Sequence, residues 1–415
     1  MASLNAVALS QVPPAHDVRR LLLAKGLRGF ADGFVSLLLP LHLLNLGFTP
    51  FQVGLVATAT LLGSGVLTLL VGTQAGRFPS RTLLLAATAL MVGTGLAMAS
   101  LQAFWPILLV AVVGTINPSG GDVSVFLPLE HALLSRAVGD RGRTAAFARY
   151  SLVGTLSAAF GALAAGLPSL MAQAWGLAQP VAVQAMFGLY AVLAVLAGLV
   201  YRGLPAREPA AVKEERSALG PSRKRVFVLA SLFSLDAFGG GFVVQSLVAL
   251  WLYQRFGLSV ETAGAIFFWT GVLTAASYLV AVRIASRIGL VKTMVYTHLP
   301  SSLCLLAIPF CSDVQAAIAL LLIRSALSQM DVPTRSSYVM AVVTPAERPA
   351  AASVTSVPRS LAAAASPALA GYLLGLSTFG WPLVVGGALK IVYDLLLLGM
   401  FSRVRPPEEE SSGPS

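Results

Sequence analysis

Five ionisable residues stand deep inside long apolar stretches of this chain, namely Asp32, Asp122, Asp236, Arg324 and Asp331. A charged side chain near the middle of a bilayer costs about 2.5 kcal/mol or more, so it is expected only where it has a partner or a function. Carboxylates in such places can take up and release a proton. These residues are therefore candidates for binding a proton or a small polar ligand.

Two of the carboxylates support different interpretations. Asp32 has Arg28 one helical turn before it, so it is either half of an ion pair on one helix or a cavity carboxylate that exchanges a proton. Asp236 has no cation nearby in the sequence, which makes it the preferred proton carrier. Asp331 follows Arg324 by about two turns and is more typical of a polar network that includes Arg335.

The arginines indicate a second chemistry. Arg324 either pairs across the bundle with Asp122 or Asp32, or it holds a ligand carboxylate or phosphate, because a guanidinium stays charged and binds such groups through two hydrogen bonds. Arg359 either attracts anions or extends its charge to the membrane interface. Gln245 is a further polar candidate for contact with a ligand.

The remaining buried polar residues have simpler explanations. Lys390 and Asp394 stand four residues apart and are expected to neutralise each other on one helix face. His42 and His131 are isolated from other metal-binding residue types, so we expect no metal site, and no motif indicates a cofactor.

The composition indicates that these residues lie in a bilayer. Apolar residues make up 56% of the 415 residues and charged residues only 11%, whereas about a quarter of all residues in soluble domains are charged. A spanning helix needs about 20 mostly apolar residues, and lipid favours helices because each satisfies its own backbone. The net charge of +11 comes largely from loops between apolar runs, so we do not expect nucleic-acid binding.

The apolar runs predict twelve transmembrane helices in two sets of six. The expected spans are 21–44, 51–73, 82–103, 105–134, 144–172, 180–201, 226–253, 260–284, 291–311, 314–343, 350–376 and 381–402. We predict an N-terminal bundle (1–201), a charged linker (202–225), a C-terminal bundle (226–402) and a disordered tail (403–415). Lys and Arg gather in alternate connections, which places both termini and the linker in the cytoplasm.

Glycine and proline runs interrupt two of the predicted spans. NPSGGD, from Asn117 to Asp122, lies in span 4, and DAFGGGF, from Asp236 to Phe242, lies in span 7. Such runs break or kink a helix, and protein or a water-filled cavity must then surround the freed backbone groups. The alternative is close helix packing through small residues.

The two sets of helices also carry a weak internal repeat. An offset of 210 residues aligns Leu46–Gly54 with Phe256–Gly264 and places Arg77 on Arg287. The deep charges follow the same plan, because they fall on spans 1, 4, 7 and 10. Internal repeats of this kind are typical of secondary transporters, whose substrate sites lie near the midplane between the repeats.

With twelve spans, a charged central loop and a basic loop after span 2, the chain resembles the major facilitator superfamily. The resemblance implies an all-α membrane fold of two pseudo-symmetric six-helix bundles. The family's loop pattern is Gly, three residues, Asp-Arg, one residue and Gly; here Gly72, Arg77 and Arg81 match it, with Gly76 in place of the acid. The second copy keeps Arg287 and Gly289.

Glu130 stands near the cytoplasmic end of span 4, within expected reach of Arg77 or Arg81, and a gate pair there is one interpretation. Together with Gly72, Arg287, Gly289 and Arg335 these residues form the candidate gate and loop set.

The expected function is secondary active transport by alternating access, not catalysis. No nucleophile elbow, clustered catalytic residues or nucleotide-binding loop is present. Proton-coupled export of a small organic compound is the first hypothesis, and uptake or exchange of an organic anion through Arg324 and Arg359 is the alternative. The expected setting is a bacterial inner membrane, in which the chain acts as a monomer with lipid, protons and a small-molecule substrate as partners.

Overall fold

The computed structural model describes residues 15–74, 77–119, 124–206, 219–344 and 347–401, and within these ranges the regular structure is helical. The first group of helices comprises α2 (Ala15–Asn45), α3 (Pro50–Gln74), α4 (Ser80–Ser100), α5 (Phe104–Val113), α6 (Phe126–Ala164), α7 (Leu167–Trp175) and α8 (Gln179–Arg202).

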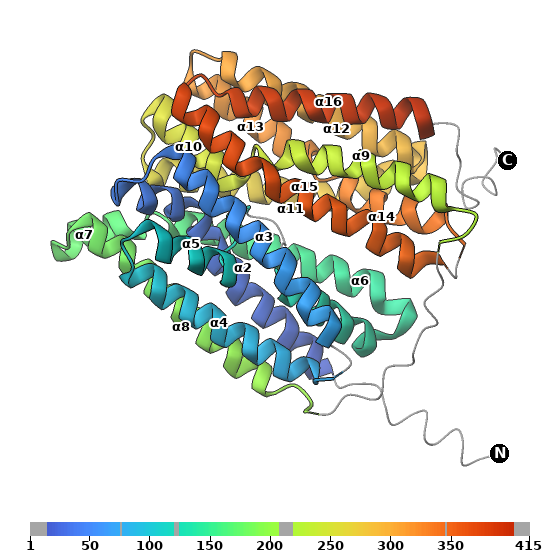
Figure 1. Ribbon diagram of the computed structural model, residues 1–415, viewed down its shortest axis with the longest axis horizontal. Coiled ribbons are helices and arrows are strands. Elements are labelled where there is room, and N and C mark those ends of the chain that lie inside the picture. Colours follow the sequence, from blue (N-terminus) through green and yellow to red (C-terminus); the bar gives the residue numbers. More distant parts are fainter. Residues whose placement is uncertain (1–14, 75–76, 120–123, 207–218, 345–346, 402–415) are drawn as a thin grey trace.

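The second group follows the central linker. It comprises α9 (Arg223–Gly241), α10 (Gln245–Phe256), α11 (Val260–Ile288), α12 (Leu290–Ala307), the short turn η1 (Ile308–Phe310), α13 (Val314–Leu327), α14 (Asp331–Ala341), α15 (Arg348–Leu376) and α16 (Trp381–Phe401). Figure 1 shows the two groups stacked one above the other, with the start of α2 and the end of α16, the described termini, at the same end.

These helices form the twelve predicted spans. Nine segments of the described chain are long and apolar enough to cross a membrane, α5 and α13 are shorter apolar helices that begin two further spans, and the 29-residue α15 forms the twelfth. Large apolar side chains on the outside, such as Trp105 and Leu109, are 75% and 65% exposed. Exposed apolar surface on this scale suits a protein whose outer face contacts lipid.

Helix α6 runs from span 4 into span 5. Its 39 residues exceed the length of one span, and the hydroxyl of Tyr150 donates a hydrogen bond to Glu130, 20 residues earlier. A straight helix would separate these two residues by about 30 Å. The chain therefore doubles back between Glu130 and Tyr150, which agrees with the boundary that the basic residues predict there.

Three spans are broken near the middle of their length. In span 4 the helix α5 ends at Val113 and the next described helix begins at Phe126, span 7 is interrupted between α9 and α10, and span 10 between α13 and α14. The first two breaks coincide with the glycine-rich runs of the sequence, so the expectation of interrupted helices is confirmed there. The corresponding span 1 is the single helix α2, although it contains Pro40.

The two groups of helices meet at the end away from the termini, which we call the loop end; the opposite end is the termini end. Helix α3 packs on α15, α6 on α11 and α2 on α10. A Cβ added to Gly54 would lie 2.4 Å from the carbonyl oxygen of Pro367, and one on Gly264 would lie 2.5 Å from that of Ala162. In Figure 1 the groups diverge from this end towards the termini.

Candidate functional site

The second group of helices encloses a buried network of charged side chains centred on Asp236. This residue lies on α9, five residues before the helix ends at Gly241, and is only 4% exposed. One carboxylate oxygen accepts a hydrogen bond from Lys390 Nζ at 2.7 Å, and the other accepts one from Arg335 Nη2 at 2.9 Å. Asp236 therefore contacts two cations, both of which are remote from it in the sequence.

Arg335 joins Asp236 to Asp331. Asp331 begins α14, and Arg335 follows one turn later on the same helix and donates a hydrogen bond to it. The guanidinium carbon lies 5.2 Å from the ring centroid of Phe233 and 6.0 Å from that of Tyr393. The expectation of a polar network around Asp331 that includes Arg335 agrees with this arrangement, and the assignment of Arg335 to the gate set stays a prediction.

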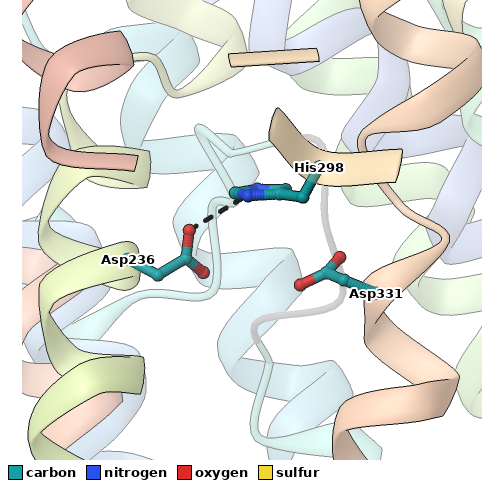
Figure 2. Close-up of side chains that lie close together, drawn as sticks. All are labelled: Asp236, His298 and Asp331. Carbon is teal, nitrogen blue, oxygen red and sulfur yellow. Dashed lines mark ion pairs between the residues drawn. The ribbon is translucent and has the colours of Figure 1, made fainter. Parts of the chain in front are cut away.

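His298 and Asp394 complete the network. Helix α12 directs the imidazole between two carboxylates, with Nδ1 at 2.9 and 3.0 Å from the two oxygens of Asp394. Nε2 lies 3.6 Å from Asp236 Oδ1, and Figure 2 shows His298 above Asp236 and Asp331. The expected pairing of Lys390 with Asp394 is wrong, because Lys390 reaches Asp236 and Asp394 contacts His298 instead.

Asp236, His298 and Asp331 offer ligand atoms within 4.8 Å of one another, a spacing that could hold a metal ion. The chain already fills this space with its own cations, since Arg335 bridges the two carboxylates and Lys390 contacts Asp236. A metal ion would have to displace both positive side chains from Asp236. The donor set is therefore better suited to ion pairs and a proton than to a metal.

A second buried cluster lies in the first group of helices, around Glu130. This carboxylate is fully buried and accepts hydrogen bonds from Arg28 of α2, Tyr150 of α6 and Tyr201 of α8, the last at 2.6 Å. Arg28 also lies 4.1 Å from the ring centroid of Phe126. The expected reach of Glu130 to Arg77 or Arg81 is wrong, because its three hydrogen bonds come from within the bundle.

Two of the candidate arginines contact no acidic side chain among the described residues. Arg324 on α13 is half-buried and Arg359 on α15 is exposed, and neither side chain makes a hydrogen bond or ion pair with the described residues. Arg359 lies about 17 Å along α15, near the middle of a span, and within electrostatic range of Arg335, Asp236 and Asp331. Arg324 lies within electrostatic range of Asp236.

The other ligand candidates lie close to the helix breaks or along α2. Asp32 is half-buried on α2, within electrostatic range of the Tyr190 hydroxyl. Gln245 begins α10 and is half-buried. Its neighbour Ser246 donates a backbone hydrogen bond of 3.1 Å to the Pro118 carbonyl, which links the break in span 7 to that in span 4. Asp122 lies outside the described residues.

The candidates that belong to the two loop motifs lie at the termini end of the molecule, opposite the loop end. Gly72, Arg77 and Arg287 are exposed, and Arg81 is half-buried at the start of α4. Gly289 separates α11 from α12 with φ of +86°, a backbone conformation that favours glycine, which explains why this position of the repeat keeps its glycine.

His298 and Lys390 are the members of the network that sequence reasoning does not place there. One signal could have found them, since His298, Lys390 and Asp394 are ionisable residues well inside spans 9 and 12. Lys390 and His298, however, face Asp236 of span 7, and no spacing in the sequence relates the three helices.

Comparisons with known proteins agree with the fold. The model of the Major Facilitator Superfamily matches residues 21–253 and again 229–415. An uncharacterized membrane protein of Saccharomyces cerevisiae is 25% identical over 93% of this chain and 94% of its own length.

Solved structures show the same arrangement at low identity. The nucleoside transporter NupG superposes with a TM-score of 0.70 at 14% identity, covering 93% of this chain and 99% of NupG. The human organic anion transporter MFSD10 superposes with a TM-score of 0.66 at 19% identity, covering 93% of this chain and 100% of MFSD10. At these identities the likeness concerns the fold alone.

Proposed function

The chain belongs to the Major Facilitator Superfamily and is a membrane transporter, and we propose that it exports a small organic compound in exchange for protons. The observation that carries this proposal is the network around Asp236, where three carboxylates and a histidine are buried in mid-membrane. Such groups are costly in lipid and are characteristic of proton pathways. The network joins the broken spans 7 and 10, and substrate sites of secondary transporters lie at such discontinuous helices.

Alternating access is supported by the distribution of contacts between the two groups of helices. The close approaches of α3 to α15 and of α6 to α11 lie at the loop end. With the basic termini end placed in the cytoplasm, this conformation is closed towards the outside. We propose that rocking of the two groups opens the loop end and closes the termini end.

A second candidate function is uptake or exchange of an organic anion, favoured by Arg324 and Arg359. A guanidinium without a counter-charge at mid-membrane depth is costly, and a bound carboxylate or phosphate would offset that cost. The two candidates differ in which residues must contact the cargo.

Reconstitution into proteoliposomes can distinguish the candidates. A pH-sensitive dye inside the vesicles reports proton movement when unlabelled neutral, cationic and anionic compounds are added one at a time, with and without an imposed pH gradient. Export in exchange for protons predicts that a compound drives proton movement and that Asp236→Asn abolishes it. Asp313→Asn, at the exposed start of α13, is the matched control and should transport normally.

The anion alternative predicts a different pattern. Only anionic compounds would move, and Arg324→Ala or Arg359→Ala would stop them. Compound flux without any proton movement, unaffected by Asp236→Asn, would contradict the proton-coupled proposal.

A further inference from the structure

His298 is held between two carboxylates, and each ring nitrogen faces one of them. Nδ1 contacts both oxygens of Asp394, and Nε2 faces Asp236 Oδ1 at 3.6 Å. A neutral imidazole has one N–H and one lone pair, so one nitrogen would turn its lone pair towards a carboxylate. An imidazolium has two N–H groups and suits both neighbours. The geometry therefore favours an added proton.

Asp394 gives an independent reason for that proton. The residue is fully buried, and among the described residues His298 is the group that contacts its carboxylate. Asp236, by contrast, has both Lys390 and Arg335 in contact. Lys390 lies within electrostatic range of Asp394 but makes its contact with Asp236, so a proton on the imidazole or on Asp394 itself is needed to balance this third buried carboxylate.

We propose that the His298–Asp394 pair is the site that binds the coupling proton of this transporter. The inference rests on the proton-coupled transport proposed above, and it moves the proton from Asp236 to a pair on α12 and α16. When loaded, the imidazole carries the proton on Nε2 while Nδ1–H donates to Asp394. Release returns a neutral imidazole and leaves Asp394 without a positive partner.

Lys390 provides a path from proton release to the broken helix. It lies one turn before Asp394 on α16 and now contacts Asp236. Loss of the proton attracts the ammonium towards Asp394, because residues four apart on a helix are neighbours. Asp236, five residues before the break between α9 and α10, would then keep only Arg335. Deprotonation is thus transmitted to span 7 by the shift of one lysine.

The surroundings of His298 contain charged groups on every neighbouring element of this network. Helix α9 contributes Asp236, α14 contributes Asp331 and Arg335, and α16 contributes Lys390, Tyr393 and Asp394. Two further arginines, Arg324 of α13 and Arg359 of α15, lie within electrostatic range of Asp236. Asp236 and Asp331 are neutralised by direct contacts with cations. His298 and Asp394 are the contacting pair in which a proton supplies the positive charge.

Infrared difference spectroscopy on pH change tests the site without any substrate. The full chain in lipid, with isotope-labelled histidine, should show an imidazole band that titrates. His298→Gln should remove that band, and Asp394→Asn should remove the titration while keeping the fold, because the network then needs no proton for balance. His42→Gln is the control, since His42 is buried on α2 beside Phe187 of α8, within the first group of helices and not part of the network. A titration of the histidine bands that is unchanged from the unmodified protein in both His298→Gln and Asp394→Asn would overturn the proposal.

Flux measurements connect the site to coupling. With the compound that gives the largest dye signal in the proteoliposome panel, both network variants should lose proton movement, whereas His42→Gln should retain it. Proton movement that survives in His298→Gln overturns this inference and leaves the proposed function standing. Compound flux without proton movement in the unmodified protein is instead a failure of the proposed function.

Discussion

At the scale of single residues, the two buried clusters differ in how completely they are satisfied. Glu130 accepts hydrogen bonds from three donors, which leaves little for a ligand to add. In the other cluster, Nε and Nη1 of Arg335 and the hydroxyl of Tyr393 are buried without a hydrogen-bond partner among the described residues. Buried polar atoms are normally paired, so the first cluster is suited to stability and the second to change.

Replacing Glu130 with Gln should destabilise the protein by about 3 kcal/mol, because Arg28 would remain buried beside a neutral partner. Thermal unfolding of the purified protein measures the loss. The double variant Arg28→Gln with Glu130→Gln removes both charges and should recover part of the stability. If the two single losses simply add in the double variant, Arg28 and Glu130 do not act as a pair.

At the scale of helices, the positions of the spans and of two breaks could be predicted because they depend on local composition. Apolar runs of about 20 residues define spans, and the glycine runs near Asn117 and Gly239 mark breaks. The break between α13 and α14 has no such run, with Ser328–Met330 in its place, and the sequence pattern does not predict it. Partners such as Lys390 for Asp236 depend on how distant helices pack, which local patterns do not encode.

One connection between helices depends on a single carboxylate. Glu347, just before α15, accepts hydrogen bonds from the backbone N–H groups of Gly220 and Ser222, which precede α9, and from Thr344. These hydrogen bonds lower the pKa of Glu347 from an ordinary value of 4.5 to about 2. The Thr344 hydroxyl has the largest effect, and the hydroxyl and backbone groups of the segment before α9 add to it. The carboxylate therefore ties the start of α9 to the start of α15.

Because the folded-state pKa is below the ordinary value, this contact stabilises the protein fully above pH 4.5. Its contribution should be lost as the pH falls from 4.5 to about 2. Hydrogen exchange at Gly220 and Ser222, corrected for intrinsic rates, should show protection that decreases over this range. Glu347→Gln should show weak protection at every pH, and equal protection in both proteins would contradict the role of the carboxylate.

At the scale of the whole molecule, contact between the two groups of helices depends on small residues at the loop end. Gly54 of α3 and Gly371 of α15 approach until a Cβ on Gly371 would lie 2.4 Å from the carbonyl oxygen of Pro50. Ala368 N donates a hydrogen bond of 3.0 Å to Thr58 one turn further along. In the alternating-access mechanism proposed above, these contacts exist only in the conformation that is closed at the loop end, so their loss would change the balance between conformations.

Gly54→Leu should shift the protein towards the conformation that is open at the loop end and closed at the termini end, because the larger side chain cannot fit against Pro367 and Gly371. Ser356, exposed on α15 one turn from Arg359, reports the change when replaced by Cys in a protein whose Cys304 and Cys311 are replaced by Ser. Its reaction with a water-soluble maleimide should slow several-fold in Gly54→Leu.

Gly65→Leu is the matched control, because Gly65 lies on the same helix with nothing within 4 Å of its added Cβ. Equal labelling rates in the two variants would show that the α3–α15 contact does not hold the loop end closed, and the proposed rocking motion would then depend on the α6–α11 and α2–α10 contacts instead.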